Sequence, residues 1–449
     1  MRLKPPEITT PNGNPYFSDK LGRNEFGDSL FEIFKNIEDN SVICLDAPWG
    51  EGKTSFIKMW RSNLKDKEIN TIYFDAYEND YNEDPFLSFI SEILALAEKD
   101  FGGVDKVQES RKDLKKQAIK IAKNILIPTS KIALKALTYG LIDSSNLEEL
   151  KNVKGDITEF TDKTFSKYVE EKIDNVQKDK DSVKHFKHLL SDLGEEIRKK
   201  QGFQLLIIID ELDRCRPDFA LLLLERIKHL FSVDNVSFLI VTHLKQLKNY
   251  VQTVYGKEID AHNYLHKFFT LTTTLPKQAP NTYSGYHTEF WKNLGTHHKL
   301  NKVHDLGETA LPLFKHLVFS LREIEKVGVI LTIFYSSKNG NSYFAQVVAI
   351  IAIIKVRFHE LYQKLLTSSC SFDDLYSSLN MGTLSIEING AEHVHYSISY
   401  LQFLLLTDEE LEQLSEDDQA KTFRQQYRHS NRKTMLLSLI MTMEQFKIE

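Results

Sequence analysis

The loop at residues 47–54 carries the side chains best suited to bind phosphate. It reads APWGEGKT and differs at one position from the signature G-x-x-x-x-G-K followed by Ser or Thr. Gly50 and Gly52 let the backbone turn its N–H groups toward phosphate oxygens, and a following helix adds its positive N-terminal end. Lys53 would reach the β- and γ-phosphates, and the Thr54 hydroxyl would ligate Mg²⁺. The loop therefore predicts a site for a nucleoside triphosphate, which we expect to be ATP.

One residue of this loop departs from the signature. Ala47 stands where the first glycine is expected, which has a cost only if that position needs a positive φ angle. The alternative is an ordinary strand-to-helix loop with no ligand. A second motif of matching chemistry would argue against that alternative.

Residues 205–211, LLIIIDE, supply this second motif as an apolar strand that ends in two acids. Asp210 is the natural acid to hold Mg²⁺ through water, and Glu211 is the natural general base for the attacking water. Two solvated acids at the end of a strand are the alternative. The pair is expected in an NTPase core, so the two motifs support each other.

The elements that must position these motifs follow from hydrophobic patterns. Apolar runs typical of buried parallel strands lie at residues 41–46, 70–80, 203–210 and 236–243, with helical patterns between them. Strands that alternate with helices predict an α/β fold with a parallel sheet. We predict an N-terminal arm at 1–15, a P-loop NTPase core at 16–100 and 202–276, a helical insertion between its halves at 101–201, and a mostly helical lid or C-terminal region at 277–449.

Within the C-terminal region, alternating apolar residues on both sides of Asn389-Gly390 predict a small hairpin over residues 383–401. The run at residues 347–354 is too short to span a membrane and predicts a buried helix.

Composition excludes several classes of protein. The chain has 449 residues, of which 41% are hydrophobic and 27% charged, so it is neither wholly disordered nor a coiled coil. A net charge of -6 has the wrong sign for a protein whose whole surface binds nucleic acid. Three dispersed cysteines and an N-terminus without a signal-peptide pattern indicate the reducing cytoplasm.

The segment around the acidic motif resembles a known family. Residues 207–231, IIIDELDRCRPDFALLLLERIKHLF, are similar to the Walker B region of the KAP family of P-loop NTPases. DKLGRNEF at 19–26, YFDAYEND at 73–80 and YLHKFFTLTTTLP at 264–276 fit the family in the same order, and the resemblance covers about residues 16–335. It implies ATP hydrolysis, which we expect to switch conformation because the sequence shows no second group to accept the phosphoryl. Because the family includes a plasmid-borne phage-exclusion protein, it also implies a role in bacterial anti-phage defence.

The chain departs from the family at three places. Glu211 stands where the family usually has a second aspartate, and Thr242-His243 where it often has an aspartate, which leaves the residue that senses the γ-phosphate open. Many members carry transmembrane helices in the insertion, whereas this insertion has no spanning segment.

Three arginines are candidates to stabilise transition-state charge. Arg214 and Arg216 follow the acidic motif, and the resemblance favours Arg322 as a lid residue; structural ion pairing is the alternative for each. The predicted site comprises nucleotide contacts at Trp49, Gly50, Glu51, Gly52, Lys53, Thr54 and Ser55, metal ligands Thr54 and Asp210, and catalytic residues Glu211, Lys53, Arg322 and Arg214.

The insertion contains a basic amphipathic stretch, with lysines at 112, 116, 120 and 123. A solvated face is favoured over contact with nucleic acid or a membrane surface. The histidine pairs at 185 and 188 and at 393 and 395 lack convincing ligand spacing, so we assign no metal site to them.

We therefore expect an ATPase that acts on a protein effector or responds to a phage-derived trigger, with self-association as a further expectation. The alternative is a nucleotide-sensing adaptor or a peripheral membrane scaffold with little or no turnover.

Overall fold

Two units make up the fold, and they interleave along the chain. The computed structural model describes residues 8–11, 13–19, 21–37, 40–82, 85–101, 113, 162–277, 285–300, 303, 306–336, 344–385, 388, 390–427 and 431–445. The sheet unit consists of residues 29–47 and 63–274. The helical unit consists of residues 1–28, 48–62 and 275–449, and it contains the P-loop as well as the C-terminal helices.

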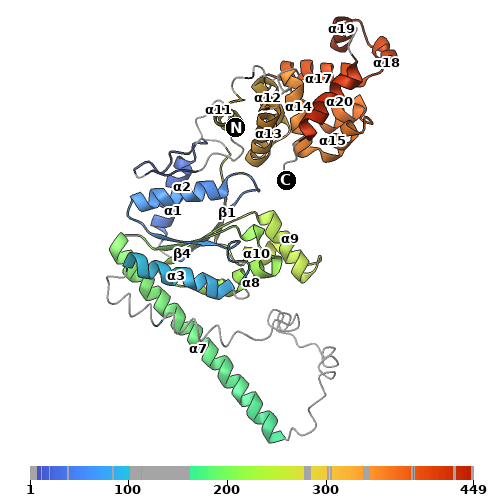
Figure 1. The fold of residues 1–449 in the computed structure, drawn as a ribbon. Helices are drawn as coiled ribbons and strands as arrows, with labels where there is room; N and C mark the ends of the chain where they lie inside the picture. Colours follow the sequence, from blue (N-terminus) through green and yellow to red (C-terminus); the bar gives the residue numbers. More distant parts are fainter. Residues whose placement is uncertain are drawn as a thin grey trace. The chain divides into compact units, whose positions relative to one another are not determined.

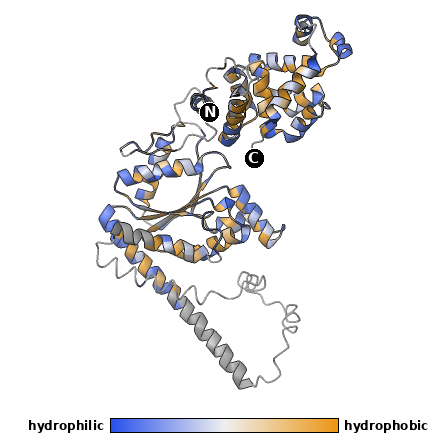
Figure 2. Cartoon of the chain, viewed as in Figure 1, coloured by the Kyte–Doolittle hydropathy of each residue, from blue (hydrophilic) through white to orange (hydrophobic). Residues whose placement is uncertain are grey.

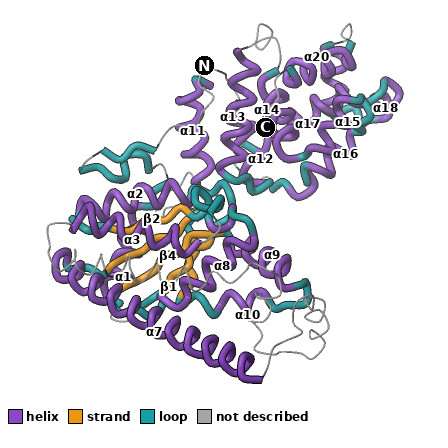
Figure 3. The backbone as a smooth tube through the Cα atoms, turned by 60° about the horizontal axis from the view of Figure 1, so that its bottom comes forward, coloured by secondary structure: helices purple, strands orange, loops and turns teal. Residues whose placement is uncertain are grey.

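A five-stranded parallel sheet is the centre of the sheet unit (Figure 3). The strands are β1 (Val42–Asp46), β2 (Thr71–Asp75), β3 (Leu205–Asp210), β4 (Val236–Thr242) and β5 (Leu271–Thr274). They lie in the order β2-β3-β4-β1-β5. The four predicted strands are confirmed, although β2 ends at Asp75 and residues 76–80, which were predicted to continue it, form a turn. The sequence did not reveal β5, because this edge strand reads LTTT and is mostly exposed, so it lacks the apolar run of a buried strand.

The strand register brings polar residues together at the carboxyl end of the sheet. Asp46 on β1 pairs with Thr242 on β4, and Asp75 on β2 pairs with Asp210 on β3. All five strands run in the same direction, so their carboxyl ends meet at one side, where parallel α/β sheets bind ligands. The fold thus places the acidic motif where its predicted chemistry requires it.

Helices cover both faces of the sheet. Apolar strand residues pack against α3 (Pro85–Phe101), α7 (Asp162–Gln201), α8 (Pro217–Ile227) and α9 (Leu244–Tyr255), and α10 (Ala261–His266) packs beside α9. On the opposite side of the strands lies α1 (Asn24–Asn36), where the Phe31 ring stacks on Phe203 with centroids 5.5 Å apart (Figure 1). Because both faces are covered, the inner strands are apolar along nearly their whole length (Figure 2).

The insertion predicted at residues 101–201 is described in part. Its last segment is α7, a helix of 40 residues whose C-terminal half packs into the sheet core through Phe186, Leu190 and Ile197. The basic stretch at residues 112–123 falls outside the described residues, apart from Asp113 in a helix.

The C-terminal part of the helical unit is a bundle that packs around α14 (Ala345–Arg357). Every residue from Gln346 to Ile354 is buried, as expected of a helix that is apolar on all sides. This confirms the buried helix predicted at residues 347–354. No helix in the described ranges is long and apolar enough to cross a membrane. The other helices are α11 (Tyr286–His298), α12 (Leu306–His316), α13 (Leu321–Ser336), α15 (His359–Leu366), α16 (Phe372–Ser378), α17 (Ala391–Leu405), α18 (Asp408–Gln413), α19 (Gln419–Gln426) and α20 (Arg432–Glu444).

The hairpin predicted at residues 383–401 is wrong, because the second half of that range lies inside α17. Its apolar residues alternate, but Val394, Ile398 and Leu401 also recur at helical spacing, and all three are buried in the core of the bundle. Gly390 has a φ of 90° directly before the helix, so it marks a helix start. The apolar residues fit both the two-residue period of a strand and the period of a helix, and the helix forms because its apolar face packs into the bundle.

Candidate functional site

The P-loop has the backbone shape that its glycines predict. Gly50 and Gly52 have φ angles of +83° and +79°, which L side chains rarely adopt. Ala47 is not among the described residues with positive φ, and its N–H donates a hydrogen bond to the Thr242 carbonyl at 3.1 Å. The alanine in place of the first glycine is therefore tolerated without backbone strain.

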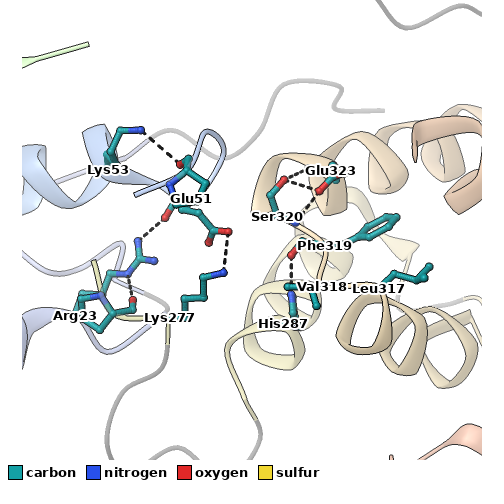
Figure 4. A network of polar contacts seen from close by, with 12 residues as sticks. Arg23, Glu51, Lys53, Lys277, His287, Leu317, Val318, Phe319, Ser320 and Glu323 are labelled. Atoms are coloured by element: carbon teal, nitrogen blue, oxygen red, sulfur yellow. Dashed lines mark hydrogen bonds and ion pairs between the residues drawn. The ribbon is translucent and has the colours of Figure 1, made fainter. Parts of the chain in front are cut away.

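A helix end follows the loop and offers its positive N-terminus to an anion. The first turn of α2 (Lys53–Asp66), all of it described, contains no acidic residue that would compete with a phosphate for the N–H groups. The Lys53 side chain is buried, with its Nζ 3.5 Å from the Pro48 carbonyl oxygen (Figure 4). Of the other predicted contacts, Thr54 and Ser55 are half-buried and Trp49 is exposed. These groups fit a triphosphate, and their contacts with one remain a prediction.

The start of α13 lies against the P-loop. The N–H of Arg322 donates a hydrogen bond to the Gly50 carbonyl oxygen at 3.2 Å. A Cβ atom added to Gly50 would lie 2.6 Å from the Cβ of Arg322 and 3.2 Å from the Oγ of Ser320. Gly50 is thus required both for its φ angle and for this close approach. The predicted lid arginine does reach the P-loop, through its backbone.

Glu51 and Arg23 fasten the P-loop from the side (Figure 4). The Arg23 guanidinium donates to the Glu51 carbonyl oxygen at 2.8 Å and to the Pro276 carbonyl oxygen at 3.1 Å. The Glu51 carboxylate is buried and lies 3.6 Å from Lys277. Burial raises the pKa of Glu51, and the charges of Lys277 and Arg23 oppose this shift. Sequence reasoning did not assign Arg23 or Lys277 to the site; only the family-like segment around Arg23 hinted at the first.

Asp210, the predicted metal-side acid, lies fully buried at the end of β3. One carboxylate oxygen accepts the Glu211 N–H at 2.8 Å, and the other accepts the hydroxyl of Tyr73 at 3.2 Å. Tyr73 lies on the neighbouring strand β2, and burial together with the Asp210 charge raises the pKa of its hydroxyl. The tyrosine therefore stays protonated and orients the carboxylate. Tyr73 begins the family-like segment at 73–80, but that segment assigned it no role, because the role depends on the pairing of β2 with β3.

Glu211, the predicted general base, has a strained backbone and a bound partner. Its φ of 60° is rare for a residue other than glycine, and strain of this kind gathers at functional sites. Its buried carboxylate pairs with the Nε of Arg214 at 2.7 Å. The structure therefore realises the ion-pair alternative for Arg214. In this arrangement the base must leave the guanidinium before it can accept a proton freely.

Arg216 is also ion-paired. It donates three hydrogen bonds of 2.9 Å to Asp80, from its backbone N–H and its guanidinium. Its side chain remains 55% exposed.

The motif contains a further buried acid that sequence reasoning did not select. Asp213 is fully buried, with a carboxylate oxygen 3.4 Å from the Thr242 hydroxyl and a carbonyl that accepts the Tyr250 hydroxyl at 2.7 Å. Thr242, at the end of β4, is thereby linked to the acidic motif.

Together, a parallel sheet, a glycine-rich loop after β1 and paired acids after β3 define a P-loop nucleotide-binding domain. The profile of the KAP family P-loop domain matches residues 23–367. That match spans most of the chain, so the chain belongs to the KAP family of P-loop NTPases.

Other comparisons add little. The structure of the Aeropyrum pernix ORC2 protein in ADPNP–ADP complexes covers 97% of this chain and 98% of its own, at 12% identity and a TM-score of 0.35. A score this low supports no conclusion about this chain. No curated protein matches the sequence.

Proposed function

We propose that this chain binds ATP with Mg²⁺ and hydrolyses it to switch conformation. The observation that carries the proposal is the P-loop itself, with both glycines in the left-handed region and the start of α13 against Gly50. Membership of a P-loop NTPase family supports the same function. A loop in this position can bind a triphosphate and transmit its presence to the helix that contacts it.

The predicted metal ligands and catalytic residues each have a role in this proposal. Lys53 holds the β- and γ-phosphates, and Thr54 and Asp210 supply the oxygen ligands that Mg²⁺ prefers. When bound, the metal neutralises phosphate charge. Glu211 accepts the proton of the attacking water once its ion pair with Arg214 opens. Arg322, with the Arg214 that is then released, stabilises the negative charge that develops.

Calorimetric titration with Mg-ATP tests the site. We expect the wild type to bind and Lys53→Ala to lose most of its affinity, because the charge that meets two phosphates is gone. Lys58→Ala is the matched control, since this lysine is exposed on the same helix. Equal affinity of wild type and Lys53→Ala would contradict the assignment of this loop as the ATP-binding site.

Hydrogen exchange tests the switch. Protection measured with a non-hydrolysable ATP analogue should differ from that measured with ADP in residues 101–201 and around Arg322. A ligand can shift a conformational equilibrium only by its differential affinity for the two states. If the changes in protection are confined to residues 50–54, the switch is contradicted, and the chain is a hydrolase without a switch or a passive nucleotide binder.

The second candidate function is a nucleotide-sensing adaptor with little turnover. The ion pair between Glu211 and Arg214 favours it, because it keeps the general base occupied. Phosphate release under saturating ATP separates the two functions. Binding without release would establish the adaptor.

We place the switch in bacterial anti-phage defence in the cytoplasm, by analogy with the phage-exclusion member of the family. Its partner would be a protein effector or a phage-derived trigger, and the switch would include self-association. Plaque counts on bacteria that express the wild type or Lys53→Ala test this role, and equal counts would contradict it.

A further inference from the structure

The turn that joins α12 to α13 has an unusual residue at its critical position. It ends α12 as a Schellman motif: the Phe319 N–H donates to the Phe314 carbonyl at 2.9 Å and the Val318 N–H to the Lys315 carbonyl at 3.2 Å. The rings of Phe314 and Phe319 pack with centroids 5.3 Å apart, the apolar contact that accompanies this motif. Val318 occupies the left-handed position, where glycine is preferred, with a φ of 52°.

This backbone is strained. Of the described non-glycine residues with positive φ, Val318 alone is β-branched, and such a residue is a genuine outlier in this region. Its side chain is exposed, so burial does not compensate. Strain of this kind persists only where surrounding contacts hold it.

A single guanidinium, that of Arg357 at the end of α14, supplies those contacts. It donates to the carbonyls of Leu317 and Val318, the latter at 3.2 Å, and it lies over the Phe319 ring at 4.1 Å. His287 adds a hydrogen bond from its ring Nε2 to the Phe319 carbonyl at 2.7 Å. Burial lowers the pKa of His287, which keeps the ring neutral.

The same guanidinium also holds the first turn of α13. It pairs with both oxygens of the Glu323 carboxylate, at 2.7 Å and 2.8 Å. Glu323 in turn accepts the N–H and the hydroxyl of Ser320 at 2.7 Å and 2.8 Å, which caps the helix (Figure 4). Burial opposes the charge of Glu323, but these hydrogen bonds outweigh it and lower its pKa.

Arg322 lies inside this capped turn, between Ser320 and Glu323, and its N–H contacts Gly50 of the P-loop. We propose that Arg357 is a positioning residue, which clamps the turn 317–323 so that Arg322 is held against the P-loop and ATP is distinguished from ADP. This inference rests on the proposed function. The planar fork of arginine is essential to it, because Arg357 makes four hydrogen bonds, two of them to both oxygens of one carboxylate, whereas a lysine has only three donors and no fork.

Arg357→Lys tests the clamp, because it retains the charge and loses the fork. We expect affinity for a non-hydrolysable ATP analogue to fall by roughly fivefold or more relative to affinity for ADP, within the usual range of coupling between sites. An Arg322→Ala background removes the guanidinium but keeps the N–H that bonds to Gly50. In that background the same change should have no further effect on the ratio, since Arg357 acts by positioning the Arg322 guanidinium for the γ-phosphate. A purely structural role would leave the two changes additive.

Arg432→Lys is the matched control. Arg432 also caps a helix end, with hydrogen bonds to the Phe403 and Leu406 carbonyls at 3.0 Å and 2.9 Å and an ion pair to Asp408, but none of these contacts involves the turn 317–323. It should leave the ratio of ATP-analogue to ADP affinity unchanged. If Arg357→Lys behaves like Arg432→Lys, or if its effect persists undiminished in Arg322→Ala, the inference is overturned.

A further variant and the binding of nucleotide by the wild type keep the test decisive. If circular dichroism shows that Arg357→Lys does not fold, Glu323→Gln takes its place, because it weakens the ion pair with Arg357 from the side of the carboxylate. Its ratio of ATP-analogue to ADP affinity is compared with that of the wild type by the same criterion. A wild type that binds no nucleotide would contradict the proposed function. If the wild type binds nucleotide and Arg357→Lys keeps the wild-type ratio of ATP-analogue to ADP affinity, only the proposed role of Arg357 is contradicted.

Discussion

The P-loop and the acidic motif are held by different kinds of contact. At the P-loop, two main-chain carbonyls are fixed: the Gly50 carbonyl accepts the Arg322 N–H, and the Glu51 carbonyl accepts Arg23. The Glu51 carboxylate adds an ion pair with Lys277. Around the acidic motif, side chains meet side chains, with Asp210 bound by the Tyr73 hydroxyl and Glu211 by Arg214.

This difference suggests that the contacts of the P-loop fix its shape, whereas those of the acidic motif can change during the reaction. A loop fixed through its carbonyls can keep its shape when an exposed side chain such as that of Trp49 changes, but a side chain added at Gly50 disrupts it. A carboxylate held by a hydroxyl or a guanidinium can exchange that partner for water or a metal. We therefore expect variants of the loop to lose binding, and variants of the acids to separate binding from turnover.

The largest effect should come from the general base. Glu211→Gln keeps the shape of the side chain but cannot take a proton, so it should retain ATP and lose turnover by roughly 10²–10⁴-fold. Asp210→Asn should instead weaken Mg²⁺-dependent binding. Calorimetry and phosphate release measure the two effects, with Asp218→Asn, 70% exposed, as the control. Equal loss of binding in Glu211→Gln and Asp210→Asn would contradict the division of roles.

Tyr73→Phe should have the next largest effect. It removes the hydroxyl that orients Asp210, and the loss of such an outer contact typically costs about 10–100-fold in metal affinity or activity. The Mg²⁺ concentration that gives half-maximal turnover should rise, whereas Tyr77→Phe, on an exposed tyrosine of the following turn, should not change it. An unchanged Mg²⁺ requirement in Tyr73→Phe would assign the tyrosine to packing.

Gly50→Ala tests the loop side of the comparison. The left-handed backbone alone costs about 1–2 kcal/mol, and the new Cβ meets Arg322 at 2.6 Å. Gly202→Ala carries a similar φ cost, with a φ of +68° and nothing within 4 Å of the added Cβ. Thermal unfolding should show a larger loss for Gly50→Ala, together with weaker ATP binding. Equal losses of stability in Gly50→Ala and Gly202→Ala would mean that the start of α13 moves away from the new Cβ without destabilising the fold.

Arg216→Lys should have the smallest effect. The Arg216 side chain is 55% exposed and a lysine keeps its charge, so the substitution should change the free energy of unfolding by about 0.2–1 kcal/mol, less at high salt. Urea denaturation at two salt concentrations measures this. A fall in turnover that depends on protein concentration would instead make Arg216 a residue that acts across a subunit interface.

The sequence predicted the parts whose signal is local. Buried parallel strands such as β3 and β4 are apolar along their length, and the loop at residues 47–54 needs glycines at fixed positions. Strand β5 was not predicted because it is an exposed edge strand and lacks an apolar run. The hairpin was wrong because the apolar residues of α17 fit both a period of two and a helical period, and only burial distinguishes them.

The sequence by itself determined the phosphate-binding loop, the paired acids and the strands that precede them, because each is encoded within a few consecutive residues. Tertiary structure alone decided what those residues touch. Tyr73 reaches Asp210 across 137 positions, and Arg357 reaches Glu323 across 34. The physical reason is that hydrogen bonds and ion pairs are specific to geometry and not to distance along the chain. An arginine that clamps a strained turn beside the P-loop therefore has the same local sequence signal as any surface arginine.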